Sequence, residues 1–287
     1  MEGFDTIVQG VLLGGLYAMF AVGLSLMFGI MRLVNIAHGD FIVLAAYLAL
    51  LVTEGLGLSP LASLVLVVPA MFGLGYALQR GVLNRTLGQD ILPPLLVTFG
   101  LSVILQNLLL EFFSADSRKL FQGSLETASL TMGGLSVGVM PLLVFCSAVA
   151  IIGGLQLLFY KTALGRAFRA TSDDQQTAQL MGINNAHIFG LAMALAMAVV
   201  AIAGVFLAIR TSFDPTVGPA RLLYGFEAVI IGGLGSLWGT LAGGVILGVA
   251  QAVGAKIDPG WQILAGHLVF LLILIVRPRG LFPRSVD

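Results

Sequence analysis

Side chains that could do chemistry are few in this 287-residue sequence, and they are widely scattered. The three histidines, His38, His187 and His267, are far apart and lack the spacing of metal ligands, and a single cysteine, Cys146, excludes an internal disulfide. Serines in the apolar stretches have no histidine or lysine partner at helical spacing, which argues against an enzyme acting within a membrane. The sequence therefore predicts a protein that is not an enzyme and that binds no metal or cofactor itself.

One acidic residue, Glu227, lies in the otherwise apolar stretch YGFEAVI at 224–230. An ionisable residue inside a membrane costs roughly 2.5–3.5 kcal/mol on insertion scales and tends to face an interior or a cavity. Two interpretations carry equal weight. In one, Glu227 faces a transport pathway, near a substrate amine. In the other, it is an interfacial carboxylate near the outer surface, or a partner of Arg221 or Arg210.

A second polar group, formed by Asn35, His38 and Asp40, follows the first apolar stretch. These residues either line the exit of a pathway or satisfy backbone groups where the first helix ends. The second interpretation is favoured, with Asp40 capping the second helix, because caps are common at helix boundaries. Gln106 and Asn107, which are polar within the fourth apolar stretch, are expected to hydrogen-bond between helices.

The whole composition is that of an integral membrane protein. Hydrophobic residues make up 58% of the chain and charged residues only 10%, with a mean hydropathy of +1.03. A soluble domain carries about 25% charged residues, so no soluble core could absorb this excess. The net charge of zero argues against nucleic-acid binding. The acidic start, MEGFD, does not resemble a cleaved signal peptide.

The fold class that follows is all-α: one polytopic transmembrane domain over residues 1–287, with about eight spans. The spans are predicted at 7–31, 41–57, 60–80, 91–113, 139–160, 187–209, 222–254 and 261–277. Glycines at 232, 233, 235 and 239 break the seventh into a half-helix at 222–234 and a helix at 238–255. Such interruptions often mark a transport pathway. Glycine pairs spaced four apart, Gly10/Gly14 and Gly244/Gly248, predict close helix packing.

Basic residues favour the cytoplasmic side of a membrane and so predict the orientation. Clusters follow the third span, the fifth span and the last span, and all can be cytoplasmic if the N-terminus is outside, residues 222–254 cross the membrane twice, and the C-terminus is inside. They consist of Arg80 and Arg85; Lys161, Arg166 and Arg169; and Arg277, Arg279 and Arg284. The polar segment at 114–138 is then an external loop.

The polar segment at 161–186 is then cytoplasmic, and it contains the signals of a short helix. Ser172 followed by Gln175 resembles a capping box, and Gly182 suits the position that ends a helix, so a helix is predicted at 173–181. Such a helix is either a lever for a soluble partner or a solvated connection. No segment is long enough for a nucleotide-binding domain, and no P-loop motif occurs, so any ATPase must be a separate chain.

Three stretches together resemble a known family, the branched-chain amino acid permeases of bacterial ABC importers, which are related to ribose and urea permeases. The first runs from GGLYA at 14–18 through FGIMR at 28–32 to NIAHGD at 35–40. The second is TALGRAFRA at 162–170, and the third is IGGLGS at 231–236 with Gly239. The resemblance covers nearly the whole chain. The acidic residue at position 227 departs from the family pattern.

This resemblance implies specific roles for two groups of residues. The segment at 161–186 would be the coupling loop that docks on an ATPase, through Gly165, Arg166, Arg169, Asp173, Asp174, Ala178 and Gly182. The substrate pathway would involve Asn35, His38, Glu227, Gly232, Gly233 and Gly235.

The resemblance also implies the partners of the chain: a second permease subunit (a sister chain or a copy of itself), two ATPase subunits that bind ATP and Mg²⁺, and a periplasmic substrate-binding protein. The chain would lie in the bacterial inner membrane and carry branched-chain or related amino acids. The alternatives are a permease for urea, an amide or an aromatic acid, and a self-contained secondary transporter or channel.

Overall fold

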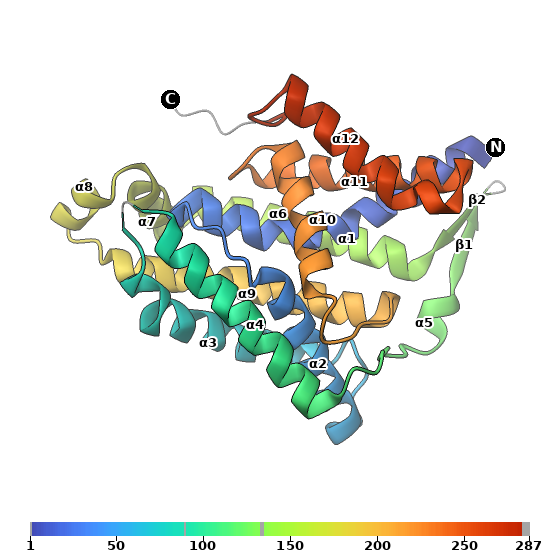
Figure 1. The fold of residues 1–287 in the computed structure, drawn as a ribbon, viewed down its shortest axis with the longest axis horizontal. Coiled ribbons are helices and arrows are strands. Elements are labelled where there is room, and N and C mark those ends of the chain that lie inside the picture. The colour runs from blue at the N-terminus through green and yellow to red at the C-terminus, as the bar shows by residue number, and fades with distance from the viewer. Residues whose placement is uncertain (1, 89, 133–134, 283–287) are drawn as a thin grey trace.

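The computed structural model describes residues 2–88, 90–132 and 135–282, and these form a bundle of helices (Figure 1). The prediction of an all-α polytopic membrane protein is confirmed, because eight of the described helices are long and apolar enough to span a bilayer. Arg284, one of the basic residues used for the orientation, lies outside the described residues. The longer helices are α1 (Glu2–Met31), α2 (His38–Leu56), α3 (Leu64–Gly81), α4 (Leu92–Phe113), α6 (Val139–Lys161), α7 (Ala163–Asp173), α9 (Asn185–Arg210), α10 (Gly218–Gly232), α11 (Leu237–Ile257) and α12 (Gln262–Val276).

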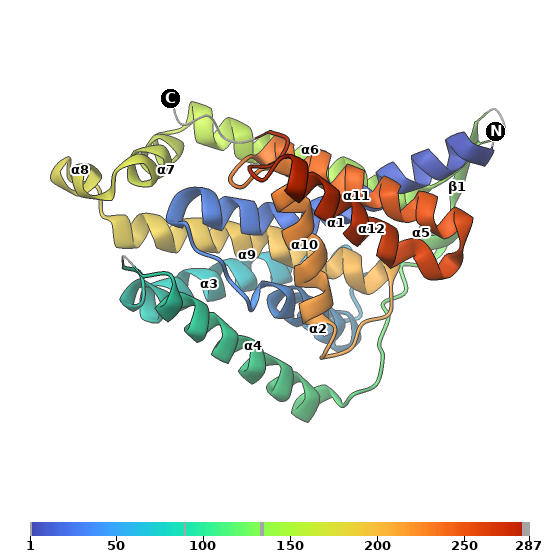
Figure 2. The same cartoon turned by 45° about the horizontal axis from the view of Figure 1, so that its top comes forward.

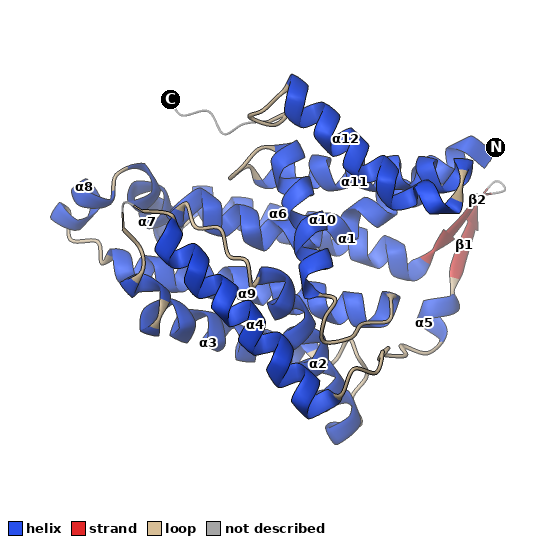
Figure 3. Ribbon diagram, in the orientation of Figure 1, coloured by secondary structure: helices blue, strands red, loops and turns tan. Residues whose placement is uncertain are grey.

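The shorter elements connect these helices. Two are 3₁₀ turns, at Leu83–Arg85 and Pro259–Trp261, and two are short helices, α5 (Ser124–Thr127) and α8 (Gln175–Leu180). Strands β1 (Ser129–Met132) and β2 (Leu135–Gly138) form an antiparallel hairpin (Figure 3). The segment predicted as an external loop at 114–138 therefore contains regular structure, and a bridge between Arg118 and Phe213 ties it to the residues after α9.

Two helices, α1 and α9, form the centre of the bundle. They lie side by side and run in opposite directions (Figures 1 and 2). In the most apolar stretch of each, 83% of the residues are buried, against 17% in α4 and 6% in α12. The apolar surfaces of α4 and α12 are thus left for lipid or for another chain, whereas α1 and α9 are shielded by protein.

The close packing predicted from the glycine pairs is present between α1 and α11. A methyl group added at Gly14 would overlap the backbone of Val245 and Gly244, and one added at Gly248 would overlap the backbone of Gly10 and Gly14. In lipid, helices associate through such close backbone contact, because the hydrophobic effect does not drive them together. Glycine at these positions therefore sets how closely α1 and α11 approach.

The two halves of the bundle contain the same order of helices and linkers, and they run in opposite directions. In the first half, α1 is followed by a non-helical linker at 32–37 and then by α2 and α3; in the second, α9 is followed by a linker at 211–217 and then by α10 and α11. Helix α1 packs on α10 and α11 of the second half, and α9 packs on α2 and α3 of the first. The fold is thus an inverted repeat with exchanged contacts, an arrangement found in many transporters.

Two names are used below for the ends of this bundle. The Met31 end holds the C-terminus of α1, the C-terminus of α6 and the segment α7–α8; the Arg210 end holds the start of α1 and the C-termini of α9 and α11 (Figure 1).

Candidate functional site

The polar segment at 161–186 projects from the Met31 end as two short helices, α7 and α8 (Figure 1). Thr162 caps α7, since its hydroxyl oxygen accepts a hydrogen bond from the Gly165 backbone N–H at 3.0 Å. A methyl group at Gly165 would overlap the carbonyl oxygens of Leu158 and Phe159. Glycine at this position therefore lets α7 fold back tightly against the end of α6.

Arg169 and Phe168 fasten α7 to α6. The Arg169 guanidinium donates a hydrogen bond to the Phe159 carbonyl and lies 5.0 Å from the centre of the Tyr160 ring. Phe168 is fully buried and packs on Phe159 with 5.4 Å between ring centres. These contacts occupy Arg169 within the chain, whereas Arg166, one turn earlier, is exposed.

The predicted helix at 173–181 is wrong in its start and in its cap. Residues 163–173 already form α7, and Asp174, not Ser172, caps α8: its carboxylate accepts hydrogen bonds from the N–H groups of Gln176 at 2.9 Å and Thr177 at 3.1 Å. The Thr177 hydroxyl, which also donates to this carboxylate, and the two backbone bonds hold the pKa of Asp174 below its usual value. The Ser172 hydroxyl instead donates to the Gly29 carbonyl of α1 at 2.7 Å.

The end of α8 follows the prediction. Gly182 has a φ of 85°, and the N–H of Ile183 donates to the Ala178 carbonyl at 3.0 Å, as expected where a helix ends in a left-handed residue. The tip just before this turn carries two apolar side chains that point into solvent, Leu180 at 87% and Met181 at 79% exposure. Ala178, by contrast, is buried.

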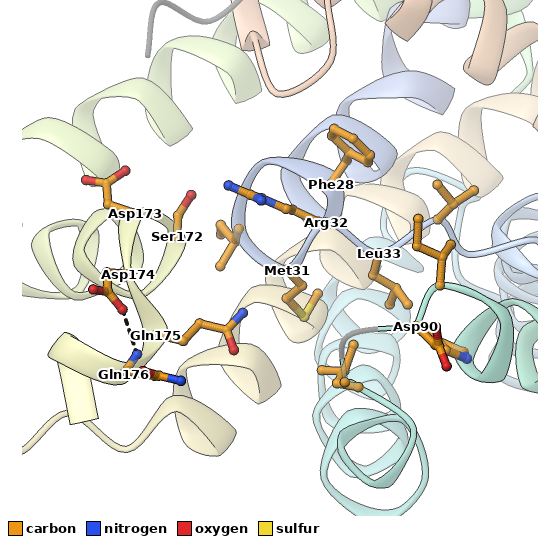
Figure 4. Close-up of a pocket in the computed structure, with 16 residues that line it drawn as sticks. Phe28, Met31, Arg32, Leu33, Asp90, Ser172, Asp173, Asp174, Gln175 and Gln176 are labelled. Atoms are coloured by element: carbon orange, nitrogen blue, oxygen red, sulfur yellow. Dashed lines mark hydrogen bonds between the residues drawn. The ribbon is translucent and has the colours of Figure 1, made fainter. Parts of the chain in front are cut away.

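A cavity of about 670 Å³ opens between α7–α8, the end of α1 and the start of α4. Figure 4 shows the Arg32 side chain extending from the end of α1 toward Ser172, while Asp90 lies on the opposite wall and Asp173 and Asp174 on the α7–α8 side. Arg32 itself has a left-handed backbone, with a φ of 53°, where α1 ends. The segment α7–α8 is thus separated from α4 by an open space rather than packed against it.

A second cavity, of about 250 Å³, brings two of the predicted groups together. Arg169, which was predicted for ATPase coupling, lines it together with Gly235, which was predicted for the pathway. Gly29 of α1 also lines this cavity: its carbonyl accepts the Ser172 hydroxyl, and its Cα faces Gly235. The segment α7–α8, the end of α1 and the turn after α10 therefore form one contact network at the Met31 end.

The predicted break in the seventh span is present as the turn between α10 and α11. Gly233 and Gly235 have φ values of 106° and 81°, which favour glycine. A methyl group at Gly232 would overlap the Gly239 carbonyl, so the two helices touch at this turn. The chain after α12 closes the turn, because the N–H groups of Leu281 and Phe282 donate to the carbonyls of Ile231 and Gly232.

Asn35 and His38 lie in the linker between α1 and α2 and at the start of α2. The linker does not stay at the Met31 end: His38 is fully buried beside the middle of α1, where its Nε2 donates to the Phe20 carbonyl at 2.8 Å. The Asn35 side chain accepts from the Ala37 N–H at 3.0 Å. Both residues thus satisfy backbone groups, and neither lines one of the described cavities.

Asp40 does not cap α2, contrary to the prediction, because α2 begins before it, at His38, without a side-chain cap. Its buried carboxylate accepts hydrogen bonds from the Ser102 hydroxyl at 2.5 Å and from Gln106 at 3.0 Å, both on α4. The carboxylate also touches Gly218, where α10 begins. Two helix N-termini, those of α2 and α10, therefore place their partial positive charges near it.

Glu227 is buried, with 2% of its side chain exposed, and pairs with a residue that the sequence did not single out as its partner. The Nδ1 atom of His267 on α12 lies 2.5 Å from its Oε1 atom. Neither Arg221 nor Arg210 forms an ion pair with Glu227, so that predicted pairing is not present. The side chains of Glu227 and His38 bond to different partners, which are His267 and the Phe20 carbonyl.

The sequence did not reveal three polar contacts between residues that are remote in the chain: Ser102 with Asp40, Gln251 with Tyr17, and His267 with Glu227. Gln106 does bond between helices as expected, whereas the Asn107 side chain bonds to Val103 within its own helix. Within the described residues, no group of three or more His, Cys, Asp and Glu side chains could hold a metal ion.

Comparison with known proteins gives one consistent family. The model of the family described as "Branched-chain amino acid transport system / permease component" matches residues 6–277. The chain is 31% identical to the high-affinity branched-chain amino acid transport system permease protein BraD of Pseudomonas aeruginosa, over 97% of this chain and 95% of that protein. It is 28% identical to the corresponding permease protein LivH of Salmonella typhimurium, over 96% and 94%.

One solved structure has a similar fold. It is PsaBC from Streptococcus pneumoniae in complex with Fab, one chain of which matches with a TM-score of 0.50 and 14% identity, over 94% of this chain and 91% of that chain. At this identity the likeness concerns the fold alone.

Proposed function

The chain belongs to the branched-chain amino acid transport permease family, and on that premise we propose that it is the membrane-spanning subunit of an ATP-driven importer for branched-chain or related amino acids. It has no catalytic role of its own in this proposal. Separate ATPase chains bind ATP and Mg²⁺, a second permease completes the pathway, and a periplasmic binding protein delivers the substrate. The chain resides in the bacterial inner membrane.

The observation that carries the proposal is the segment α7–α8. It projects beyond the bundle, it is held to α6 and α1 by Gly165, Arg169 and Ser172, and its tip exposes Leu180 and Met181. Two exposed apolar side chains at a helix tip are what a hydrophobic groove on a partner protein would bind. A rigidly anchored lever with an apolar tip can pass the motion of an ATPase to α1 and α6.

The orientation follows from the same assignment. If α7–α8 meets an ATPase, the Met31 end is cytoplasmic, the N-terminus is outside, and the C-terminus is inside. This orientation also puts the basic residues after α3, α6 and α12 on the cytoplasmic side, as the positive-inside tendency requires. The hairpin β1–β2 and α5 then face the periplasm, where a binding protein would dock.

Two alternatives remain distinct from this proposal. A permease for urea, an amide or an aromatic acid would share the fold and the coupling segment, and would differ only in the solute. A self-contained secondary transporter would move solute without any ATPase chain, and it would leave the exposed tip of α8 without a partner.

The test is co-purification of the ATPase chains encoded with this permease. We expect Leu180→Glu/Met181→Glu to lose the ATPases and ATP-dependent uptake while keeping the thermal stability of the wild type. Phe121→Glu is the matched control, because Phe121 is also exposed, at 71%, but lies at the Arg210 end, in the connection between α4 and α5. ATPase binding that survives the double substitution would overturn the coupling role.

The orientation is tested separately by labelling in a Cys146→Ser background. We expect Gln176→Cys to react with a membrane-impermeant reagent only in inverted vesicles, and Ser124→Cys only in spheroplasts. The reverse pattern would place α7–α8 outside and would also exclude its contact with a cytoplasmic ATPase.

A further inference from the structure

A cluster of polar side chains lies between the helices toward the Arg210 end, apart from the coupling segment. Five helices contribute to it, and α10, which runs across the others in Figure 1, contributes the most. We call it the tyrosine cluster, and its members are Tyr17 of α1, Arg210 of α9, Arg221, Tyr224 and Glu227 of α10, Gln251 of α11 and His267 of α12.

Two tyrosines hold this cluster together. The Tyr17 hydroxyl donates to the Gln251 amide oxygen at 2.5 Å, and the rings of Tyr17 and Tyr224 lie 5.0 Å apart between centres. Arg221, Tyr224 and Glu227 follow one another at three-residue spacing in α10 and therefore share one face of that helix. The contact between the two tyrosine rings places this face beside Tyr17 of α1.

Several polar atoms of the cluster are buried without a hydrogen-bond partner among the described residues. They are Nη1 of Arg210, Nε of Arg221, Oε2 of Glu227 and Nε2 of Gln251. The Glu227 and Gln251 side chains are themselves at most 2% exposed. Unpaired buried polar groups are rare and costly, and groups that carry a charge cost the most. Such a set is typical of a binding site, where a ligand supplies the missing partners.

The chemistry of the unpaired atoms defines that ligand. The guanidinium groups donate hydrogen bonds, so they suit a carboxylate group of a ligand. The unpaired Oε2 atom of Glu227 accepts hydrogen bonds, so it suits an ammonium group. The other oxygen of the same carboxylate is bonded to His267. An anion alone would leave Oε2 of Glu227 without a partner, and a cation alone would leave Nη1 of Arg210 and Nε of Arg221 without one. Only a ligand that carries both charges meets all of these groups.

We propose that the tyrosine cluster binds the zwitterionic backbone of an α-amino acid during transport, with Arg210 and Arg221 facing the carboxylate and Glu227 facing the ammonium group. This inference rests on the proposed function and adds the residues that recognise the substrate within the membrane. Recognition through the charges common to all α-amino acids leaves the choice of side chain to other parts of the importer.

The test uses the purified importer in lipid nanodiscs, without its binding protein, and follows its thermal unfolding with three probes at millimolar concentration. Leucine carries both charges, isocaproate only the carboxylate and isoamylamine only the amine. We expect leucine to stabilise the wild type most. Arg221→Gln should lose the response to isocaproate and keep that to isoamylamine, and Glu227→Gln should do the opposite. Each variant should bind leucine about tenfold more weakly or worse.

Two controls separate recognition from folding. Arg221→Lys, which retains the charge, should restore part of the isocaproate response, and Arg80→Gln removes an exposed arginine outside the cluster and should respond as the wild type does. If the wild type takes up leucine with ATP but none of the probes stabilises it, or if both cluster variants respond like the wild type, the inference is overturned while the proposed function stands. If no uptake depends on ATP, the proposed function itself fails.

Discussion

The Ser102 hydroxyl of α4 donates a hydrogen bond of 2.5 Å to the Asp40 carboxylate at the start of α2. With Gln106 one turn along, it is a main polar link between α4, which is otherwise little buried, and the core of the bundle. The N-termini of α2 and α10 both lie near this carboxyl group, and their partial positive charges act on its oxygens.

Removing this acceptor should loosen α4. We expect Asp40→Ala to lower the free energy of unfolding by about 1–3 kcal/mol for each donor that it leaves unpaired. Asp40→Asn, which keeps one acceptor oxygen, should cost less. Unfolding of the purified protein in mixed micelles measures this, and Asn107→Ala, which removes a bond within α4 alone, should change little. Equal stability of Asp40→Ala and the wild type would contradict the role of Asp40.

His38 should be needed for the linker between α1 and α2 to enter the bundle. His38→Ala leaves the Phe20 carbonyl without its side-chain donor and opens a space beside Gly23, so we expect a loss of about 2–5 kcal/mol in the free energy of unfolding. His187→Ala is the matched control, since His187 is exposed and, among the residues that the structure describes, its side chain bonds only the Tyr76 hydroxyl. Similar melting curves for the two variants would argue against the structural role of His38.

Gly165 should be intolerant of any side chain. In Gly165→Ala the new methyl group overlaps two carbonyl oxygens of α6, so α7 must move away, and we expect a loss of about 1–3 kcal/mol together with weaker ATPase binding. Gly153→Ala is the control. It adds a methyl group within α6 that has no neighbouring atom within 4 Å, so it should be neutral. The prediction is checked by uptake and by thermal unfolding of both variants side by side.

The cap of α8 should depend on pH. The pKa of Asp174 is lowered in the folded protein by the hydrogen bonds that it accepts, so the carboxylate stabilises α8 at neutral pH and the stabilisation is lost as the pH falls through this lowered pKa. Hydrogen exchange of the amides at 175–180 should therefore show protection that weakens in acid. Asp174→Asn, which can still cap, should remove the pH dependence, and a pH response that persists in this variant would assign it to another group.

Hydropathy predicted the spans well, because a run of about 20 apolar residues is enough to cross a bilayer and such a run can be recognised from the local sequence alone. The break at Gly232–Gly235 was also visible locally, because three glycines within four residues weaken a helix more than the single glycine pairs that stay inside α1, α6 and α11. The helix at 163–173 was missed, since it is amphipathic and polar, and its stability comes from contacts of Gly165 and Phe168 with α6 rather than from its own composition.

The errors at individual side chains have one physical cause, which is competition from distant partners. Ser172 and Asp174 can both cap a helix, but Ser172 lies within α7, where its hydroxyl donates to the Gly29 carbonyl, and Asp174 has the extended backbone that precedes α8. Asp40 was assigned to its own helix because its partners on α4 lie more than sixty residues away. The pairing of Glu227 with His267 likewise spans two helices that no local pattern connects.

The glycine contact between α1 and α11 has a consequence for how the protein is made. Gly14 leaves the ribosome before Gly244, on which it packs and which follows about 230 residues later. At 5–20 residues per second, the first span waits roughly 10–50 s for its main neighbour. During that interval its small-residue face is open to the bilayer, so the nascent chain should depend on insertase or chaperone protection until synthesis is nearly complete.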